Sequence, residues 1–188
     1  MRIVGGRLRG RALVNPKDDA TRPTSDRVRE AAFNILAHAI HDFSLEGAKV
    51  LDLFAGTGAL GIEALSRGAI QCLFVDDGAE ARGVIRENVE ALGLTGITKI
   101  FRRDATDLGP AGKYDQFTLV FLDPPYGKGL AAKALVSARD GGWLAANAVI
   151  VVEERKGSEV MLPAGLVEID RRTWGDTQML FARNAAAA

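Results

Sequence analysis

Apolar residues recur along this chain in short blocks that are separated by glycine-containing turns and by stretches with helical spacing. Five blocks have the length and composition of buried strands, at 48–53, 70–75, 97–102, 117–122 and 148–153. Apolar residues three and four positions apart predict helices over 25–42, 58–68, 79–92 and 129–139. Short apolar strands that alternate with helices favour a parallel sheet covered by helices on both faces.

The two ends of the chain depart from this alternation. Near the amino terminus, RIV and RALV flank GGRLRG and predict a small β-hairpin, and residues 166–174 and 178–183 predict a closing antiparallel pair. The whole pattern predicts an α/β fold with a mostly parallel, seven-stranded sheet and an added N-terminal β-hairpin. We divide the chain into an amino-terminal arm over 1–24, a main domain over 25–184 and a disordered tail over 185–188.

Composition narrows the class of protein. The 188 residues are 47% hydrophobic and carry 24 basic and 24 acidic side chains, as expected of a soluble globular protein. A single cysteine excludes an internal disulfide, and two histidines cannot form a zinc site alone, so we expect no metal. Because no signal peptide or membrane-spanning stretch is visible, we expect a cytoplasmic protein without a membrane partner.

The zero net charge conceals an uneven distribution. The first thirty residues carry a net charge of +4 and the remaining 158 carry −4. Four arginines lie in the first eleven residues with no acidic residue among them: Arg2, Arg7, Arg9 and Arg11, here called the head arginines. Arginines that neutralise phosphates contribute salt-dependent affinity without reading sequence. Overall neutrality therefore does not exclude a nucleic-acid partner.

A glycine-rich loop follows the first predicted strand. Gly56, Gly58 and Gly61 match G-x-G-x-x-G, and Asp76 stands twenty residues beyond the first of them, as in dinucleotide-binding sites. Asp52 near the strand end would repel a pyrophosphate but attract an ammonium group, and the loop holds no Arg or Lys. A ligand with a cationic end and a ribose, such as S-adenosylmethionine, satisfies both requirements.

Two later strands also end in residues suited to this ligand and its chemistry. Asp104, after the third strand, is placed to accept a hydrogen bond from an adenine amino group. The fourth strand runs into Asp123-Pro124-Pro125-Tyr126. The Asp123 carboxylate and the Pro124 carbonyl can accept the two N–H bonds of an exocyclic amino group, while Tyr126 stacks on the base. Such alignment favours in-line methyl transfer to nitrogen.

The sequence LDLFAGTGALGIEALSRGA together with FLDPPY resembles the class I S-adenosylmethionine-dependent methyltransferases that act on amino nitrogens. MRIVGGRLRGRAL and TRPTSDRVREAAFNIL further resemble the bacterial RsmD family, and the likeness extends to TWGDTQMLF near the end. This resemblance implies a Rossmann-like fold and methylation of guanine N2 in 16S rRNA. It also implies an assembling or assembled small ribosomal subunit as substrate and S-adenosylhomocysteine as product, and we expect a monomer.

The resemblance also implies roles for individual residues. Those expected to bind the cofactor are Asp52, Phe54, Gly56, Gly58, Asp76, Asp104 and Ala105. Those expected to be catalytic are Asp123, Pro124, Pro125 and Tyr126. Those expected to bind RNA are Arg2, Arg7, Arg9, Arg11, Arg22 and Arg27. Family members more often have Glu at the position of Asp76, so the distance to the ribose is open.

Four alternative functions compete with this interpretation. A DNA adenine-N6 methyltransferase shares the amino chemistry but usually carries an insertion for target recognition. A protein glutamine-N5 methyltransferase normally has Asn at the position of Asp123 and a larger N-terminal domain. A NAD-binding oxidoreductase has no use for Asp52 or the DPPY motif, and a non-catalytic RNA-binding subunit would not need Asp123.

Overall fold

The computed structural model describes residues 1–16 and 25–185. Its helices are α1 (Asp26–His38), α2 (Ala59–Ser66), α3 (Ala79–Ala91), the short 3-10 helix η1 (Thr95–Ile97) and α4 (Leu130–Asp140). Its strands are β1 (Lys49–Leu53), β2 (Gln71–Val75), β3 (Thr98–Phe101), β4 (Phe117–Leu122), β5 (Leu144–Arg155), β6 (Leu166–Trp174) and β7 (Thr177–Asn184).

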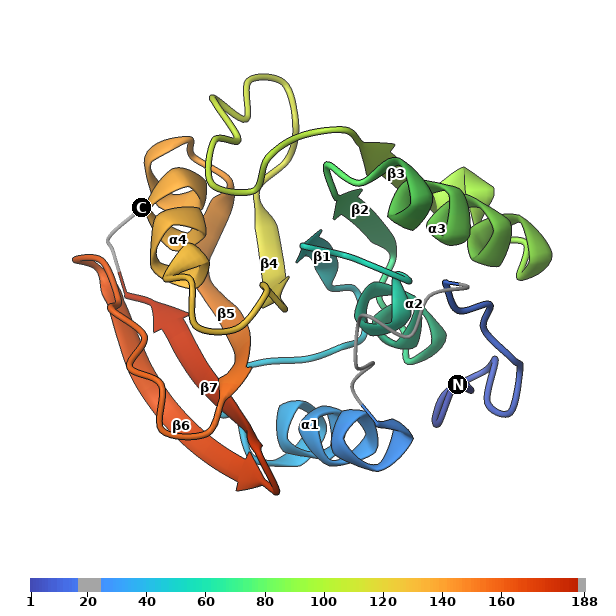
Figure 1. Ribbon diagram of the computed structural model, residues 1–188, viewed down its shortest axis with the longest axis horizontal. Helices are drawn as coiled ribbons and strands as arrows, with labels where there is room; N and C mark the ends of the chain where they lie inside the picture. The colour runs from blue at the N-terminus through green and yellow to red at the C-terminus, as the bar shows by residue number, and fades with distance from the viewer. Residues whose placement is uncertain (17–24, 186–188) are drawn as a thin grey trace.

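The seven strands form one sheet in the order β3-β2-β1-β4-β5-β7-β6. Strands β1 to β5 are parallel to one another, whereas β7 is antiparallel to both β5 and β6. The mostly parallel sheet and the closing antiparallel pair are therefore confirmed. Figure 1 shows α4 on one side of the sheet and α2 and α3 on the other.

The alternation of side chains along the strands explains why helices cover both faces. In β1, Val50 belongs to one buried cluster and Leu51 to the other. The first cluster packs against α1, α2 and α3, and the second packs against α4 and includes the fully buried Trp143. Because successive strand residues point to opposite faces, a strand that is apolar at every position requires two layers of helices.

The predicted bounds of the first helix differ from those in the structure. The first helix was expected over 25–42 but ends at His38, with Ala39 as its C-cap and Asp42 in the left-handed region at φ 54°. Apolar residues continue the helical spacing beyond this point, but they pack on the core from the following turn. At the other helix end, Ser25 caps as its residue type predicts, because its hydroxyl accepts a hydrogen bond from the Val28 amide.

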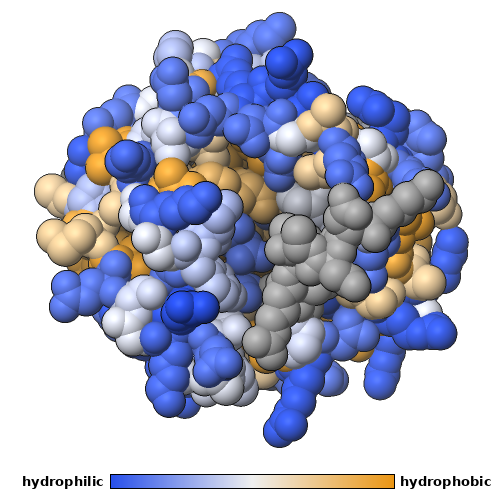
Figure 2. All heavy atoms as spheres, viewed as in Figure 1, coloured by the Kyte–Doolittle hydropathy of each residue, from blue (hydrophilic) through white to orange (hydrophobic). Residues whose placement is uncertain are grey.

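The described part of the arm packs on the main domain. The predicted hairpin is reduced to a single antiparallel bridge between Arg2 and Ala12, with Ile3 and Leu13 buried in the first core cluster. In the intervening loop, the Arg7 amide donates to the Ser66 carbonyl at 2.8 Å, at the end of α2. The face seen in Figure 2 is largely hydrophilic, with hydrophobic residues in scattered patches.

Candidate active site

The carboxyl ends of the central parallel strands bring the predicted site residues to one edge of the sheet. In the strand register, Asp52 of β1 lies beside Phe74 of β2 and Phe121 of β4. Asp76 and Asp123 then follow directly after the last residues of β2 and β4. Ligands of doubly wound sheets bind at this edge, where the strand order reverses direction along the chain.

The glycine loop is a tight turn between β1 and α2. Phe54, Gly56 and Gly58 all have positive φ, at 56°, 57° and 77°, and Gly58 is the N-cap of α2. Around Gly56, a side chain would meet only the Phe54 carbonyl oxygen, 3.9 Å away, so this part of the loop is open to a ligand. An open glycine turn at a helix N-terminus suits close approach by a cofactor.

The Asp52 carboxylate lies beneath this loop. Its side chain is only 1% exposed, and Oδ2 accepts a hydrogen bond of 2.9 Å from the Gly61 amide in α2. Burial raises the pKa of Asp52 to about 8, the charge of Asp76 adds to the rise, and the Gly61 bond opposes it. The structure thus gives Asp52 a role in fixing α2, while its contact with an ammonium group stays a prediction.

Asp76 holds the glycine loop from the neighbouring strand. Its two carboxylate oxygens accept hydrogen bonds from the Gly56 amide at 2.9 Å and from the Gly78 amide at 2.8 Å. The side chain is partly exposed. Because each carboxylate oxygen has two acceptor positions, a ribose hydroxyl can still be accommodated.

Asp104 and Ala105 lie beyond the end of β3. The exposed Asp104 carboxylate accepts bonds from the Thr106 hydroxyl at 2.7 Å and amide at 2.8 Å. These bonds lower the pKa of Asp104, which keeps the carboxylate ionised. Ala105 is buried. In this structure Asp104 therefore orders its own turn, and its contact with adenine remains a prediction.

The DPPY motif lies directly beside the glycine loop. The Asp123 amide donates to the Leu53 carbonyl at 3.4 Å, and Leu53 immediately precedes Phe54, the first residue of the loop with positive φ. Pro124 is buried, Pro125 is exposed and Asp123 is partly buried. This bond aligns the start of the DPPY turn with the start of the glycine loop.

Two buried glutamates at the end of β5 complete this edge of the sheet. The Tyr126 hydroxyl donates to Glu153 Oε1 at 2.9 Å, and the Gly127 amide donates to Glu154 Oε1 at 3.3 Å. Burial raises the pKa of the Tyr126 phenol, so it remains a protonated donor. Neither glutamate was predicted as a site residue, although Glu153 ends the fifth predicted strand and Glu154 follows it, much as acids stand at the ends of the other strands.

The carboxyl groups at this edge influence one another. Burial raises the pKa of Asp123 well above its ordinary value, and the charges of Glu153, Asp52 and Glu154 raise it further. Their mutual repulsion makes the edge receptive to a cation and to N–H donors. Such an environment also prepares Asp123 to accept a proton.

The basic residues occupy several different surroundings. The head arginines are exposed, although the Arg11 guanidinium donates to the Ala91 carbonyl at the end of α3 at 3.0 Å. Arg27 is exposed on α1, and Arg22 lies outside the described residues. The arm loop contacts the end of α2, which is one helix length, about 12 Å, from the glycine loop.

Arg29 is one of the basic residues in the first thirty positions, but it does not contribute to a basic surface. Its side chain is fully buried, contacts the Arg2 carbonyl and pairs with Asp26 at 2.9 Å and with Glu63 at 3.5 Å. Glu63 is also fully buried and pairs with Arg67 at 2.8 Å. The ion pair with Glu63 joins α1 to α2, and the contact with the Arg2 carbonyl joins the arm to α1.

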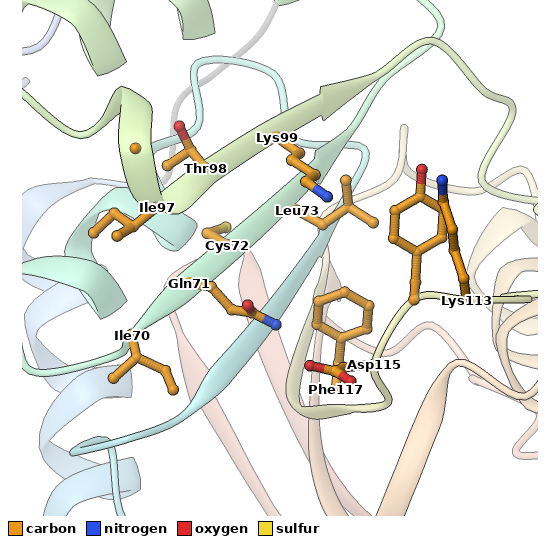
Figure 3. A pocket seen from close by; sticks show the side chains of 12 residues that line it. Ile70, Gln71, Cys72, Leu73, Ile97, Thr98, Lys99, Lys113, Asp115 and Phe117 are labelled. Atoms are coloured by element: carbon orange, nitrogen blue, oxygen red, sulfur yellow. The ribbon is translucent and has the colours of Figure 1, made fainter.

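A cavity of about 360 Å³ lies at the opposite end of the sheet. It is lined by the first residues of β2, β3 and β4, Gln71, Thr98 and Phe117, and by Lys99 and Lys113 (Figure 3). Because Asp52, Asp76 and Asp123 lie at the carboxyl ends of their strands, this cavity is separate from the candidate active site.

Two other types of site are absent from the described residues. Within 1–16 and 25–185, no three His, Cys, Asp or Glu side chains form a group that could hold a metal ion. In the same residues, no helix combines the length and apolar character needed to cross a bilayer.

Comparisons with known proteins match nearly the whole chain. The family model described as Conserved hypothetical protein 95 matches residues 1–183. Ribosomal RNA small subunit methyltransferase D of Escherichia coli is 42% identical over 154 residues, which cover 81% of this chain and 74% of that protein. The Bacillus subtilis protein YlbH is 39% identical over 181 residues, covering 94% of this chain and 95% of YlbH.

The fold is also similar to solved structures. The Escherichia coli protein yhhF has a TM-score of 0.83 at 31% identity and covers 100% of this chain and 99% of its own. A structure from Haemophilus influenzae has a TM-score of 0.79 at 28% identity and covers 98% of both chains. A mostly parallel seven-stranded sheet with these relatives is the Rossmann-like fold of class I methyltransferases.

Proposed function

Because this chain belongs to the RsmD family of methyltransferases, we propose that it methylates the exocyclic N2 of a guanine in 16S rRNA. The proposed methyl donor is S-adenosylmethionine, and the proposed substrate is an assembling or assembled small ribosomal subunit. Relatives named as rRNA small subunit methyltransferases support the choice of substrate class. We further propose that the protein acts as a monomer in the cytoplasm.

The observation that carries this proposal is the hydrogen bond between the Asp123 amide and the Leu53 carbonyl at 3.4 Å. It aligns the DPPY turn, which suits an amino group, with the glycine loop, which suits the methyl donor. The open Gly56 turn fits S-adenosylmethionine, and Asp52 and Asp76 supply acids near its proposed ammonium and ribose positions. Proximity and alignment of this kind account for much of the acceleration in transfer reactions.

The residues of the DPPY motif divide the chemistry between them. When bound, S-adenosylmethionine supplies an electrophilic methyl group on a sulfonium. The Asp123 carboxyl and the Pro124 carbonyl accept the two N–H bonds of guanine N2, which directs its lone pair toward the methyl carbon. As the new N–C bond forms and the C–S bond breaks, nitrogen becomes cationic and then loses a proton. The Asp123 carboxylate, which accepts an N–H bond of this nitrogen in the proposed complex, is the group proposed to receive that proton.

Tyr126 and Glu153 form the proposed base platform. Stacking on Tyr126 would compensate for the energy that a base loses when it leaves its helix. The hydrogen bond from the Tyr126 hydroxyl to Glu153, at 2.9 Å, fixes the far end of the ring. A ring held at both ends restricts the positions that a stacked guanine can take.

The experiment that tests the proposal compares the wild-type protein with Asp123→Ala. We expect the variant to bind S-adenosylhomocysteine with near wild-type affinity in calorimetry but to lose methyl transfer to 16S rRNA. Transfer near the wild-type rate would remove Asp123 from catalysis. Equal loss of cofactor binding would instead assign Asp123 to the cofactor site.

A further inference from the structure

One buried amide on α3 connects the arm to the glycine loop. Asn88 is only 2% exposed, although it is polar and has no part in the proposed methyl transfer. Its Oδ1 accepts a hydrogen bond of 2.7 Å from the Val14 amide. Its Nδ2 donates to the Val14 carbonyl at 3.2 Å and to the Thr57 carbonyl at 3.1 Å. One side chain therefore satisfies backbone groups from two distant segments.

The two segments belong to the two binding functions proposed above. Thr57 lies between Gly56 and Gly58, the two glycines of the turn that have positive φ. The Gly56 amide is already bound by Asp76 at 2.9 Å, so Asp76 and Asn88 each hold one part of the turn. Val14 follows the bridged part of the arm, which carries the head arginines.

Asparagine is suited to this position for a chemical reason. Its amide presents an acceptor and donors side by side, so it can pair with both backbone groups of Val14 as a neighbouring strand would. The second N–H bond of Nδ2 then reaches Thr57. An aspartate has nearly the same shape and keeps the acceptor, but it would place an oxygen against two carbonyls and leave them without a donor.

We propose that Asn88 is a positioning residue that ties the glycine turn to the arm, so that RNA bound by the arm strengthens cofactor binding. RNA that holds the arm in place also holds the Val14 backbone, and Asn88 transmits that restraint to Thr57. Because linkage is reciprocal, the cofactor strengthens RNA binding by the same factor. The coupling rests on the proposed function, because it requires RNA on the arm.

The test measures binding of S-adenosylhomocysteine by calorimetry, with and without saturating 16S rRNA, in wild type and Asn88→Asp. We expect RNA to tighten cofactor-product binding in wild type. In Asn88→Asp, we expect binding without RNA to weaken about tenfold, because the Val14 and Thr57 carbonyls lose the donor that holds the glycine turn. We also expect the effect of RNA to vanish and KM for S-adenosylmethionine to rise more than kcat falls.

A matched control separates positioning from general stability. Thr98→Val removes a hydrogen bond of 3.0 Å from the Thr98 hydroxyl to the Leu94 carbonyl, just beyond α3 and apart from the glycine loop. We expect this variant to keep the wild-type effect of RNA whatever its loss in melting temperature. If Asn88→Asp does not unfold cooperatively, Val14→Pro serves as a second variant. It removes the Val14 amide that donates to Asn88 Oδ1 and leaves the side chain of Asn88 and its bond to Thr57 in place. We expect it to abolish the effect of RNA as well.

Three outcomes would overturn the inference. They are a wild-type protein without any effect of RNA on binding of S-adenosylhomocysteine, an Asn88→Asp variant that retains the wild-type effect, and a Thr98→Val variant that loses it equally. The proposed function is tested separately by methyl transfer in wild type and Asp123→Ala. If the wild-type protein methylates rRNA but RNA does not change its affinity for S-adenosylhomocysteine, only the role of Asn88 is rejected.

Discussion

Replacing Gly61 by alanine tests why the third glycine of the loop motif is needed. A Cβ at this position would lie 2.5 Å from Phe74 Cε1, 2.6 Å from Cys72 Sγ and 3.0 Å from Asp52 Oδ2. All three neighbours are at most 3% exposed, so none can move into solvent. The helix α2 would have to shift away from β1 and β2.

The magnitude follows from two opposing effects. Overpacking a core typically costs about 1–3 kcal/mol, and two contacts below 3.0 Å place this site in the upper part of that range. Against this cost, alanine inside a helix raises the free energy of unfolding by about 0.5–1 kcal/mol relative to glycine. We therefore expect Gly61→Ala to lower the free energy of unfolding by about 1–2 kcal/mol, or the melting temperature by about 2–8 °C.

Gly83→Ala is the matched control. Gly83 lies within α3, is exposed, and has no atom within 4 Å of the Cβ that would be added. The same substitution there should raise the free energy of unfolding by about 0.5–1 kcal/mol. Both variants are measured by urea unfolding and by calorimetry with S-adenosylhomocysteine, whose affinity we expect only Gly61→Ala to reduce. A Gly61→Ala protein as stable as Gly83→Ala would refute the close-packing argument.

Three further predictions concern charged residues. Burial raises the pKa of Asp52 from 3.8 to about 8, so the folded state holds this proton more tightly and the free energy of unfolding falls as pH rises from about 4 to about 8. Asp52→Asn should flatten this fall in urea unfolding, and a pH profile identical to wild type would contradict the prediction. Arg29→Met leaves the buried Glu63 with fewer partners and should lower the free energy of unfolding by about 3 kcal/mol in thermal unfolding. The control Arg27→Met, at an exposed position on the same helix, should change it by less than about 0.5 kcal/mol, and equal effects of the two variants would disprove the buried pairing. Alanine at the head arginines Arg7, Arg9 and Arg11 should reduce the slope of log affinity for rRNA against log salt by about 2–3, and an identical slope would remove the arm from the RNA interface.

The sheet and the layers of helices could be predicted because they depend on local patterns. Strands that are apolar at nearly every position, such as β4, reveal burial on both faces, and β4 and β6 were predicted with their observed bounds. The end of α1 could not be found in this way. Apolar spacing continues beyond His38, while the helix ends where the backbone turns toward the core.

Contacts between distant segments were not predictable from spacing alone. The pairing of Arg29 with Glu63 joins residues 34 positions apart, and the sequence offers many other acids to an arginine. Glu153 carries a weak signal at the end of a predicted strand, but its partner Tyr126 is identified only by the register of β4 and β5. Asn88 carries no such signal, since its function arises from three segments meeting at one side chain.

The central claim is tested most directly by identifying the methylated product. Labelled S-adenosylmethionine is offered, in separate reactions, to unmethylated small ribosomal subunits, naked 16S rRNA, DNA and protein, and the modified residue is identified by mass spectrometry. We predict N2-methylguanosine in rRNA with the wild-type protein and none with Asp123→Ala. N6-methyladenine, or label found only in DNA or protein, would contradict the account.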